Sequence, residues 1–257
     1  MSQQHSAQEF ASRIKANSDP KLNAAADFAA RLLDSPIGPS IARIILFGSV
    51  ASNQAGPQSD VDVMVFSAAP LENRSEHAAQ AAWEASVAWG EQVAQVTFCL
   101  GDLLQPRSYL LYDTINRGKE IFSMEEAEIR RMEAEGLFRK AHRHLESAQR
   151  AASQGDFELA ILGAYTASEL AAKALILLKP GVDLPATHGG MIQVFSREYV
   201  KSGEAPERWG RTLNQGLEAR SHALYDTLVT MVERDAEPVI NLAQEMIDFL
   251  EKKLYSR

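Results

Sequence analysis

This 257-residue sequence has a single cysteine, no long apolar run and no excess of basic residues. The one cysteine, Cys99, excludes a disulfide within the chain, which is typical of proteins in a reducing compartment. The N-terminus lacks the basic-then-apolar pattern of a signal peptide, and no apolar run approaches the length of a membrane span. We therefore expect a soluble, cytoplasmic protein that does not enter a membrane.

Neither half of the chain is basic. Residues 1–124 contain 9 Lys and Arg against 13 Asp and Glu, and the remaining residues contain 17 against 21, so each half carries a net charge of −4. A surface that grips a nucleic-acid backbone without sequence preference needs a clustered excess of Lys and Arg. The charge distribution argues against a basic lobe of that kind.

The apolar patterns of the two halves differ. Residues 1–124 alternate short β-branched runs with helical patterns, which predicts an α/β domain. Residues 125–257 have helical periodicity throughout, which predicts an all-α bundle. The expected strands of the first domain cover 43–47, 61–66 and 93–100, and its expected helices cover 6–33 with a break near Asp19-Pro20, 75–90 and 109–118. In the helix over 75–90 we expect Trp83, Val87 and Trp89 to be buried.

Two acidic residues stand at the start of the second expected strand. The first strand stops at Gly48-Ser49. Ser59 follows ten residues after Ser49 and leads directly into Asp60 and Asp62, which are separated by Val61. Because side chains alternate along a strand, residues two apart project to the same side. Two neighbouring carboxylates repel one another unless a cation lies between them. The pattern therefore favours a Mg²⁺ site completed by the phosphates of a substrate.

The Gly-Ser pair followed by Asp-x-Asp resembles the minimal nucleotidyltransferase signature of the polymerase-β superfamily. By this resemblance, Gly48 and Ser49 contact the nucleotide phosphates, and Asp60 and Asp62 hold Mg²⁺. These four residues are thus the expected catalytic set of an α/β nucleotidyltransferase domain over residues 1–124. The alternative is a solvated strand edge with two aspartates and an ordinary turn glycine.

The sequence departs from the superfamily pattern in two places. Many members carry arginines and a glycine after the Gly-Ser pair, where this chain has Val50, Ser52 and Asn53, so a cationic phosphate contact is missing there. Several members also place a third carboxylate on the third strand, and that strand contains no acid here. The residues near it that could take this place are Glu91, Gln95, Thr97 and Asp102. A site that binds nucleotide and metal without efficient transfer is therefore an alternative.

The second half resembles a HEPN domain in the order of its elements. The matching elements are the helical segments 164–175 and 218–226 and the turn Thr187-His188-Gly189-Gly190 between them. HEPN ribonucleases carry an Arg followed by a His four to six residues later. Here Arg220 is followed at the fifth position by Tyr225, and His222 lies only two residues away.

We do not expect ribonuclease activity from this half, because a tyrosine is a poor general base at neutral pH. We expect His188 to order its Gly-Gly turn and His222 to face solvent or fill a gap in the bundle. Arg220 and Tyr225 remain as a candidate HEPN site near one side of a helix, with Tyr165 across from them. They would bind phosphate and a base, or they are structural residues of the bundle.

The combined resemblance implies a nucleotidyltransferase fused to a HEPN domain over residues 125–257, related to toxin–antitoxin modules. The expected reaction transfers a nucleoside monophosphate, AMP by the resemblance, from an NTP to a hydroxyl, and Tyr225 is a candidate acceptor. The expected cofactor is Mg²⁺, and the helical domain is expected to form a homodimer. The acceptor, protein or RNA, stays open. The alternatives are a non-catalytic nucleotide-binding regulator and a HEPN ribonuclease restrained by its fused partner.

Overall fold

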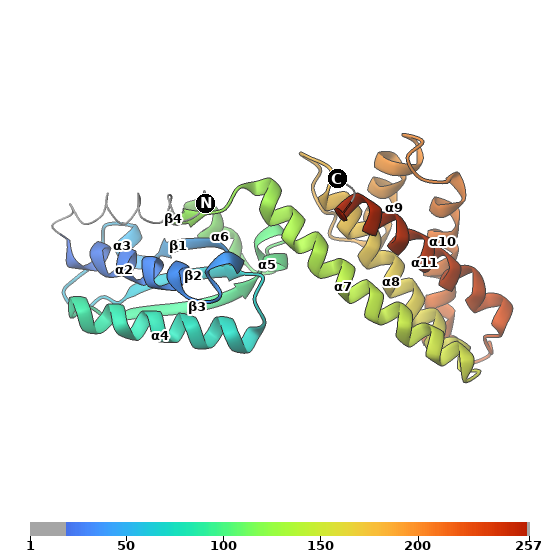
Figure 1. The fold of residues 1–257 in the computed structure, drawn as a ribbon, viewed down its shortest axis with the longest axis horizontal. Helices are drawn as coiled ribbons and strands as arrows, with labels where there is room; N and C mark the ends of the chain where they lie inside the picture. The colour runs from blue at the N-terminus through green and yellow to red at the C-terminus, as the bar shows by residue number, and fades with distance from the viewer. Residues whose placement is uncertain (1–18, 256–257) are drawn as a thin grey trace. The chain divides into compact units, whose positions relative to one another are not determined.

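The computed structural model describes residues 19–255, and the first part of the helix expected from Ser6 lies outside them. The chain divides into two compact units between Ile129 and Arg130 (Figure 1). The boundary expected from the sequence, after residue 124, lies five residues earlier. Both positions border the first turn of the helix α7 (Glu126–Ser153), where the secondary structure changes from mixed strands and helices to helices alone.

The first unit is built on a four-stranded mixed sheet with the strand order β3-β2-β1-β4. The strands are β1 (Ile41–Phe47), β2 (Val61–Ser67), β3 (Val93–Cys99) and β4 (Lys119–Ser123). The central strand β1 is antiparallel to β2 and β4, and β2 is parallel to β3. The three strands expected from the sequence are confirmed, since each is a β-branched run bounded by turn residues. The pairing of Phe47 with Asp62 places the end of β1 directly beside the start of β2.

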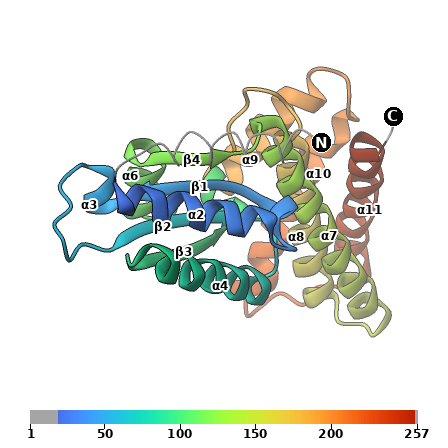
Figure 2. The same ribbon diagram turned by 60° about the vertical axis from the view of Figure 1, so that its left-hand side comes forward.

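Helices cover both faces of this sheet (Figures 1 and 2). The helices α2 (Pro20–Asp34) and α4 (Leu71–Trp89) lie side by side on one face. The short helices α3 (Gly48–Ala51) and α5 (Leu100–Leu104) extend from strand ends, and α6 (Tyr109–Arg117) packs on the other face of β1. The helix α2 begins where the sequence predicts a break, because the Asp19 side chain accepts a hydrogen bond from the Lys21 N–H at 2.9 Å.

The buried face of α4 differs from the prediction. Its buried residues are four alanines, Ala78, Ala81, Ala82 and Ala85. The buried residues of α2 include four more alanines, Ala24, Ala25, Ala26 and Ala29, together with Phe28. Trp83, Val87 and Trp89 are exposed by 64%, 67% and 37%. The prediction that they are buried was wrong, because small side chains let the two helix backbones pack closely and turn the large residues outward.

The second unit is an all-α bundle, which confirms the predicted fold class. After α7 come α8 (Phe157–Leu177), α9 (His188–Phe195) with a π-helical turn at Ser196–Val200, α10 (Glu207–Tyr225) and α11 (Glu233–Tyr255). The helix α8 is central and packs against α9, α10 and α11. Asp156 caps its start by accepting from the Leu159 N–H at 3.0 Å.

One helix of the described residues, α8, is long and apolar enough to cross a membrane by length and composition. In the structure 72% of its apolar window is buried inside the bundle. Its end is held by the guanidinium of Arg130, which donates to the carbonyls of Leu177 at 2.9 Å and Val182 at 2.6 Å. A cation at the carboxyl end of a helix is favoured by the helix dipole. The apolar character of α8 is thus that of a core helix.

Candidate functional site

The turn after β1 is formed by a glycine that no other residue could replace without strain. Gly48 has φ of +71°, a conformation that side chains with a Cβ rarely adopt. A Cβ built on Gly48 would also lie 2.3 Å from Oδ2 of Asp62. The backbone of the turn therefore lies directly against the Asp62 carboxylate, and the sequence-predicted residues Gly48 and Asp62 share one site.

The second predicted site residue, Asp62, lies close enough to Asp60 to be affected by its charge. The pKa of the Asp62 carboxyl is raised, first by its burial and second by the negative charge of Asp60. Asp60 precedes β2, and its Oδ2 is 3.5 Å from the side-chain nitrogen of Gln92. The structure thus brings Asp60 and Asp62 together at the strand start, next to the Gly48 turn. Two partly buried carboxylates repel each other, and a bound cation relieves this repulsion, so the site favours a cation.

The residues present fit a Mg²⁺ ion that is held by two carboxylates and completed by water and a substrate. Within the described part of the chain, no group of three or more His, Cys, Asp or Glu side chains could form a complete metal site. Mg²⁺ commonly uses one or two carboxylates and completes its shell with water and substrate phosphates. Asp60 and Asp62 supply that number of ligands beside a turn open to a nucleotide. Their role as metal ligands stays a prediction.

The strand register identifies the position where a third carboxylate would face the pair. On β3, Ala94 is the register partner of Asp62, and partners in neighbouring strands point to the same face of the sheet. Gln95 pairs with Val63, and Thr97 pairs with Val65, so both lie on the opposite face from Asp62. An alanine therefore occupies the place from which a β3 side chain would reach the Asp60–Asp62 pair.

Asp102 and Glu91, the two acidic residues that flank β3, interact with other residues. Asp102 follows the far end of β3, where Cys99 pairs with Ser67, roughly 15 Å or more along the strand from Asp62. Its carboxylate accepts from the Cys99 thiol at 3.0 Å and lies 3.5 Å from the Arg107 guanidinium. Glu91 precedes the near end of β3, but its carboxylate forms an ion pair with Lys21 of α2. Neither acid faces the Asp60–Asp62 pair as a third ligand.

Lys21 is a site residue that the sequence reasoning missed. Its side chain is almost fully buried, and its ammonium group donates to the carbonyl of Ser59 at 2.7 Å as well as to Glu91. This contact fixes the backbone immediately before Asp60. The signal in the sequence was a lysine in the first turn of a helix, where the helix dipole disfavours a cation unless a partner holds it.

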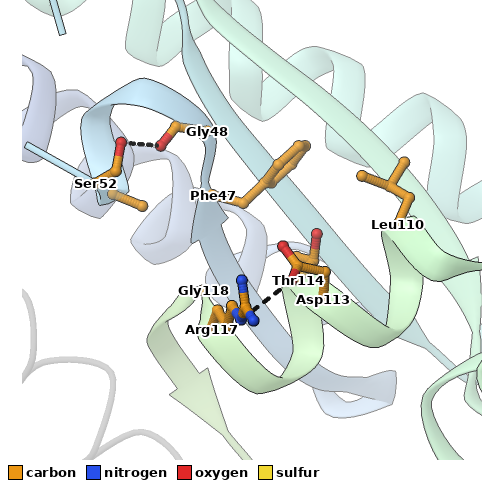
Figure 3. A pocket seen from close by; sticks show the side chains of 9 residues that line it. Phe47, Gly48, Ser52, Leu110, Asp113, Thr114, Arg117 and Gly118 are labelled. Carbon is orange, nitrogen blue, oxygen red and sulfur yellow. Dashed lines mark hydrogen bonds and ion pairs between the residues drawn. The ribbon is translucent and has the colours of Figure 1, made fainter. Parts of the chain in front are cut away.

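A cavity of about 390 Å³ lies next to the Gly48 turn (Figure 3). The turn forms one side, and the face of α6 from Leu110 to Gly118 forms the other. Phe47 and Leu110 contribute apolar walls, and Ser52 and Arg117 contribute polar groups. Because Phe47 and Asp62 are register partners, the cavity lies on the same face of the sheet as the predicted metal ligand.

In the helical unit, Arg220 contacts Tyr165, as the sequence analysis expected. The guanidinium carbon lies 5.9 Å from the centre of the Tyr165 ring. Tyr165 is fully buried, and its hydroxyl has no hydrogen-bond partner among the described residues. Burial, together with the nearby charge of Glu169, raises the pKa of Tyr165 to about 12. Tyr165 is therefore neutral at physiological pH.

Tyr225 has different surroundings from Arg220. It is the last residue of α10, and 77% of it is exposed. The expectation that the two residues lie near one side of the helix does not match this arrangement, because five residues advance a helix by about 500°, or roughly 140° beyond a full turn. Arg220 turns to the core, whereas the hydroxyl of Tyr225 is accessible.

The two histidines of the predicted motifs have distinct roles. His188 was expected to order the Gly-Gly turn, but Thr187 does this by accepting from the Gly190 N–H at 3.0 Å. The Nδ1 of His188 instead lies 2.9 Å from Oε2 of Glu169. His222 is half exposed with its Nδ1 3.3 Å from Asp226, consistent with the expected solvent-facing position.

These features define a two-domain protein with an α/β nucleotide-transfer fold and a helical bundle. Residues 31–125 match the nucleotidyltransferase domain family, and residues 134–253 match the HEPN domain family. The chain belongs to the proteins that join these two domains, which confirms the resemblance found in the sequence. Nucleotidyltransferase domains generally use a divalent metal ion.

Three similar proteins each match a little under half of this chain. The protein "Putative toxin MJ0605" of Methanocaldococcus jannaschii is 31% identical over 125 residues, which are 48% of this chain and 90% of that protein. The "UPF0332 protein" of Thermotoga maritima is 29% identical over 114 residues, 44% of this chain and 85% of that protein. "Putative toxin MJ0142" of M. jannaschii is 25% identical over 125 residues, 49% of this chain and 84% of that protein.

Proposed function

We propose that the first domain binds a nucleoside triphosphate with Mg²⁺ and transfers its nucleoside monophosphate to a hydroxyl acceptor. The observation that carries this proposal is the contact between the Gly48 turn and the carboxylate of Asp62, with Asp60 beside it. Asp60 and Asp62 would hold the metal, while Gly48 and Ser49 would seat the phosphates. The domain match to nucleotidyltransferases supports the assignment.

In the proposed reaction the acceptor oxygen forms a bond to the α-phosphorus. The bond from that phosphorus to the bridging oxygen of the β-phosphate breaks, and pyrophosphate leaves. A bound Mg²⁺ would neutralise charge on the reacting and leaving phosphates. Because Ala94 stands where a β3 carboxylate would face the site, this chain supplies no such base, and the hydroxyl proton passes to water. We therefore expect slow transfer.

The proposed acceptor is the tyrosine hydroxyl at the end of α10. Tyr165 and Tyr199 are fully buried and cannot reach a nucleotide without unfolding of their surroundings, whereas Tyr225 is exposed, as are Tyr109, Tyr112 and Tyr255. Of the exposed tyrosines, Tyr225 is the one that follows Arg220 at the fifth position in the HEPN-like segment. Two of the relatives are named as toxins, and modification of one domain by the other would suit a toxin–antitoxin function. We propose a cytoplasmic module of this class whose helical domain forms a homodimer.

Intact-mass measurement tests the transfer reaction. The full chain is incubated with Mg²⁺ and ATP, and the parent should gain the mass of AMP. The adduct should be absent in Asp62→Asn and in Tyr225→Phe, and it should persist in Tyr255→Phe, which removes a different exposed tyrosine. An adduct that persists in Tyr225→Phe would refute the acceptor. An adduct that persists in Asp62→Asn would refute the assigned site.

A second candidate function is a non-catalytic nucleotide-binding regulator. The presence of Ala94 opposite Asp62 favours it, because the site then has only two carboxylates and no third acidic group on β3. Mg²⁺-dependent binding of ATP without any adduct on the chain, or on proteins of a cell extract, would support this second function over the first.

A further inference from the structure

The phosphate turn of the proposed site has no cation of its own. Val50, Ser52 and Asn53 follow the Gly-Ser pair, and none of them is charged. A triphosphate with one bound Mg²⁺ still carries an excess of negative charge, and the carboxylates of Asp60 and Asp62 add to it. A site that binds this ligand therefore needs positive side chains from another part of the fold.

Two cations lie where α6 ends and β4 begins, on either side of Gly118. They are Arg117, the last residue of α6, and Lys119, the first residue of β4. Gly118 packs tightly onto β1, because a Cβ at this position would lie 2.3 Å from Cγ2 of Ile45 and 2.6 Å from the carbonyl oxygen of Thr114. The junction of α6 and β4 is thus fixed against β1, the strand that leads into the Gly48 turn.

Arg117 lines the cavity that the Gly48 turn forms with α6 (Figure 3). Its guanidinium pairs with Asp113, one helical turn earlier, at 3.2 Å, and 77% of the arginine side chain is exposed. An ion pair exposed to this degree is weak. The guanidinium can therefore exchange the carboxylate for a phosphate, since a guanidinium binds either group in bidentate geometry.

Lys119 reaches the turn itself. Its ammonium group donates to the side-chain oxygen of Asn53 at 3.0 Å. Asn53 ends the turn in a left-handed conformation, with φ of +58°, and its N–H donates to the carbonyl of Val50. The hydrogen bond to a neutral amide holds Lys119 beside the turn without neutralising its charge.

We propose that Arg117 and Lys119 bind the β- and γ-phosphates of the nucleoside triphosphate, in place of the arginines that the Gly-Ser turn lacks. This inference rests on the proposed nucleotidyltransferase function and assigns two further binding residues to it. Asp113 holds Arg117 in the free protein and competes with the phosphates for it. The ligand is recognised by its phosphate chain, so the contribution of both cations rises with the number of phosphates.

Calorimetric titration of the full chain with ATP, ADP and AMP in the presence of Mg²⁺ tests the proposal. Arg117→Gln should weaken binding of ATP about tenfold and Lys119→Gln about threefold, with little change for AMP. Asp113→Asn should tighten binding of ATP about threefold, because it removes a negative charge and frees Arg117. The Asp113→Asn variant gives an effect of opposite sign, which a damaged fold would not produce.

Arg107→Gln is the matched control. Arg107 is 78% exposed and pairs with Asp102 at 3.5 Å, so it resembles Arg117 in exposure and pairing, but it lies beyond the far end of β3. Binding of ATP that is unchanged in Arg117→Gln, or lowered equally in Arg107→Gln, would overturn the assignment and leave the nucleotidyltransferase proposal intact. No binding of ATP to the parent chain would overturn both.

Discussion

At the scale of single residues, the site is a place where stability and the proposed function conflict. Gly48 takes a backbone conformation that costs conformational entropy on folding, and burial and the charge of Asp60 raise the pKa of the Asp62 carboxyl, which disfavours its ionised form. Residues chosen only for a stable strand would avoid both features. Their presence side by side is expected where a cation and a phosphate supply the missing stabilisation.

Asp62→Asn should stabilise the metal-free protein at neutral pH. Because the folded-state pKa of Asp62 is raised, bound protons stabilise the fold below the ordinary aspartate pKa of about 3.9, and this contribution is lost as the pH rises through the raised pKa. Thermal unfolding at pH 7 without Mg²⁺ should show a higher Tm for Asp62→Asn than for the parent, and the difference should vanish below roughly pH 4. The exposed Asp34→Asn serves as the control. A lower Tm for Asp62→Asn at pH 7 would contradict this description of the site.

Gly48→Ala should destabilise the fold more than Gly90→Ala does. Both glycines have positive φ, +71° and +68°, so both substitutions carry the cost of the left-handed conformation, about 1 kcal/mol. At Gly90 nothing lies within 4 Å of the added Cβ, whereas at Gly48 it meets the Asp62 carboxylate. Urea unfolding should show an additional loss of about 1–2 kcal/mol for Gly48→Ala. Equal losses would mean that the turn and the carboxylate are not in contact.

At the scale of elements, helix α2 holds the site from the opposite face of the sheet. Lys21 connects α2 with the carbonyl of Ser59 before β2 and with Glu91 before β3. One cation thus joins three segments that are far apart in the sequence. The start of β2, where Asp60 and Asp62 lie, is fixed by this contact and by the hydrogen bond of the Val61 N–H with the Gln92 carbonyl at 2.8 Å.

Lys21→Met should lower both stability and nucleotide binding. It leaves the partly buried carboxylate of Glu91 without its cation, at a cost of about 2–4 kcal/mol. The loss of the contact to Ser59 should also weaken binding of Mg²⁺-ATP several-fold, because Asp60 is held less firmly. Arg31→Met removes a more exposed ion pair of the same helix, with Glu84 at 2.6 Å, and should lower stability clearly less than Lys21→Met does. Equal effects of the two substitutions would show that Lys21 does not position the site.

At the scale of the whole molecule, the patterns that the sequence reveals are those encoded within a few residues. The three strands, the Gly-Ser turn, the Asp-x-Asp pair and the caps of α2 and α8 follow from local alternation and capping. The register of β2 with β3, the alanine packing of α2 on α4 and the Lys21 anchor depend on segments 30 to 70 residues apart. No local pattern contains this information, so the exposure of Trp83 and the partner of Glu91 could not be predicted.

The same register leads to a prediction about activity. Ala94→Asp should place a third carboxylate on the Asp62 face and raise the rate of AMP transfer at least tenfold, since a positioned general base contributes about 10² to 10⁴. Transfer is measured by intact mass over time with Mg²⁺ and ATP. Val96→Asp, two residues further along the same face of β3, is the register control and should have a smaller effect. A rate unchanged by Ala94→Asp, with Mg²⁺-ATP affinity retained, would contradict the register argument.

The central claim is that Asp60 and Asp62 form a Mg²⁺-dependent nucleotide site beside the Gly48 turn. The most direct test is calorimetric titration of ATP into the parent, Asp60→Asn and Asp62→Asn, each with Mg²⁺ and with EDTA. We predict binding to the parent that requires Mg²⁺ and is lost in both variants, while their unfolding remains cooperative. Mg²⁺-dependent binding that is equally tight in all three proteins would contradict the claim.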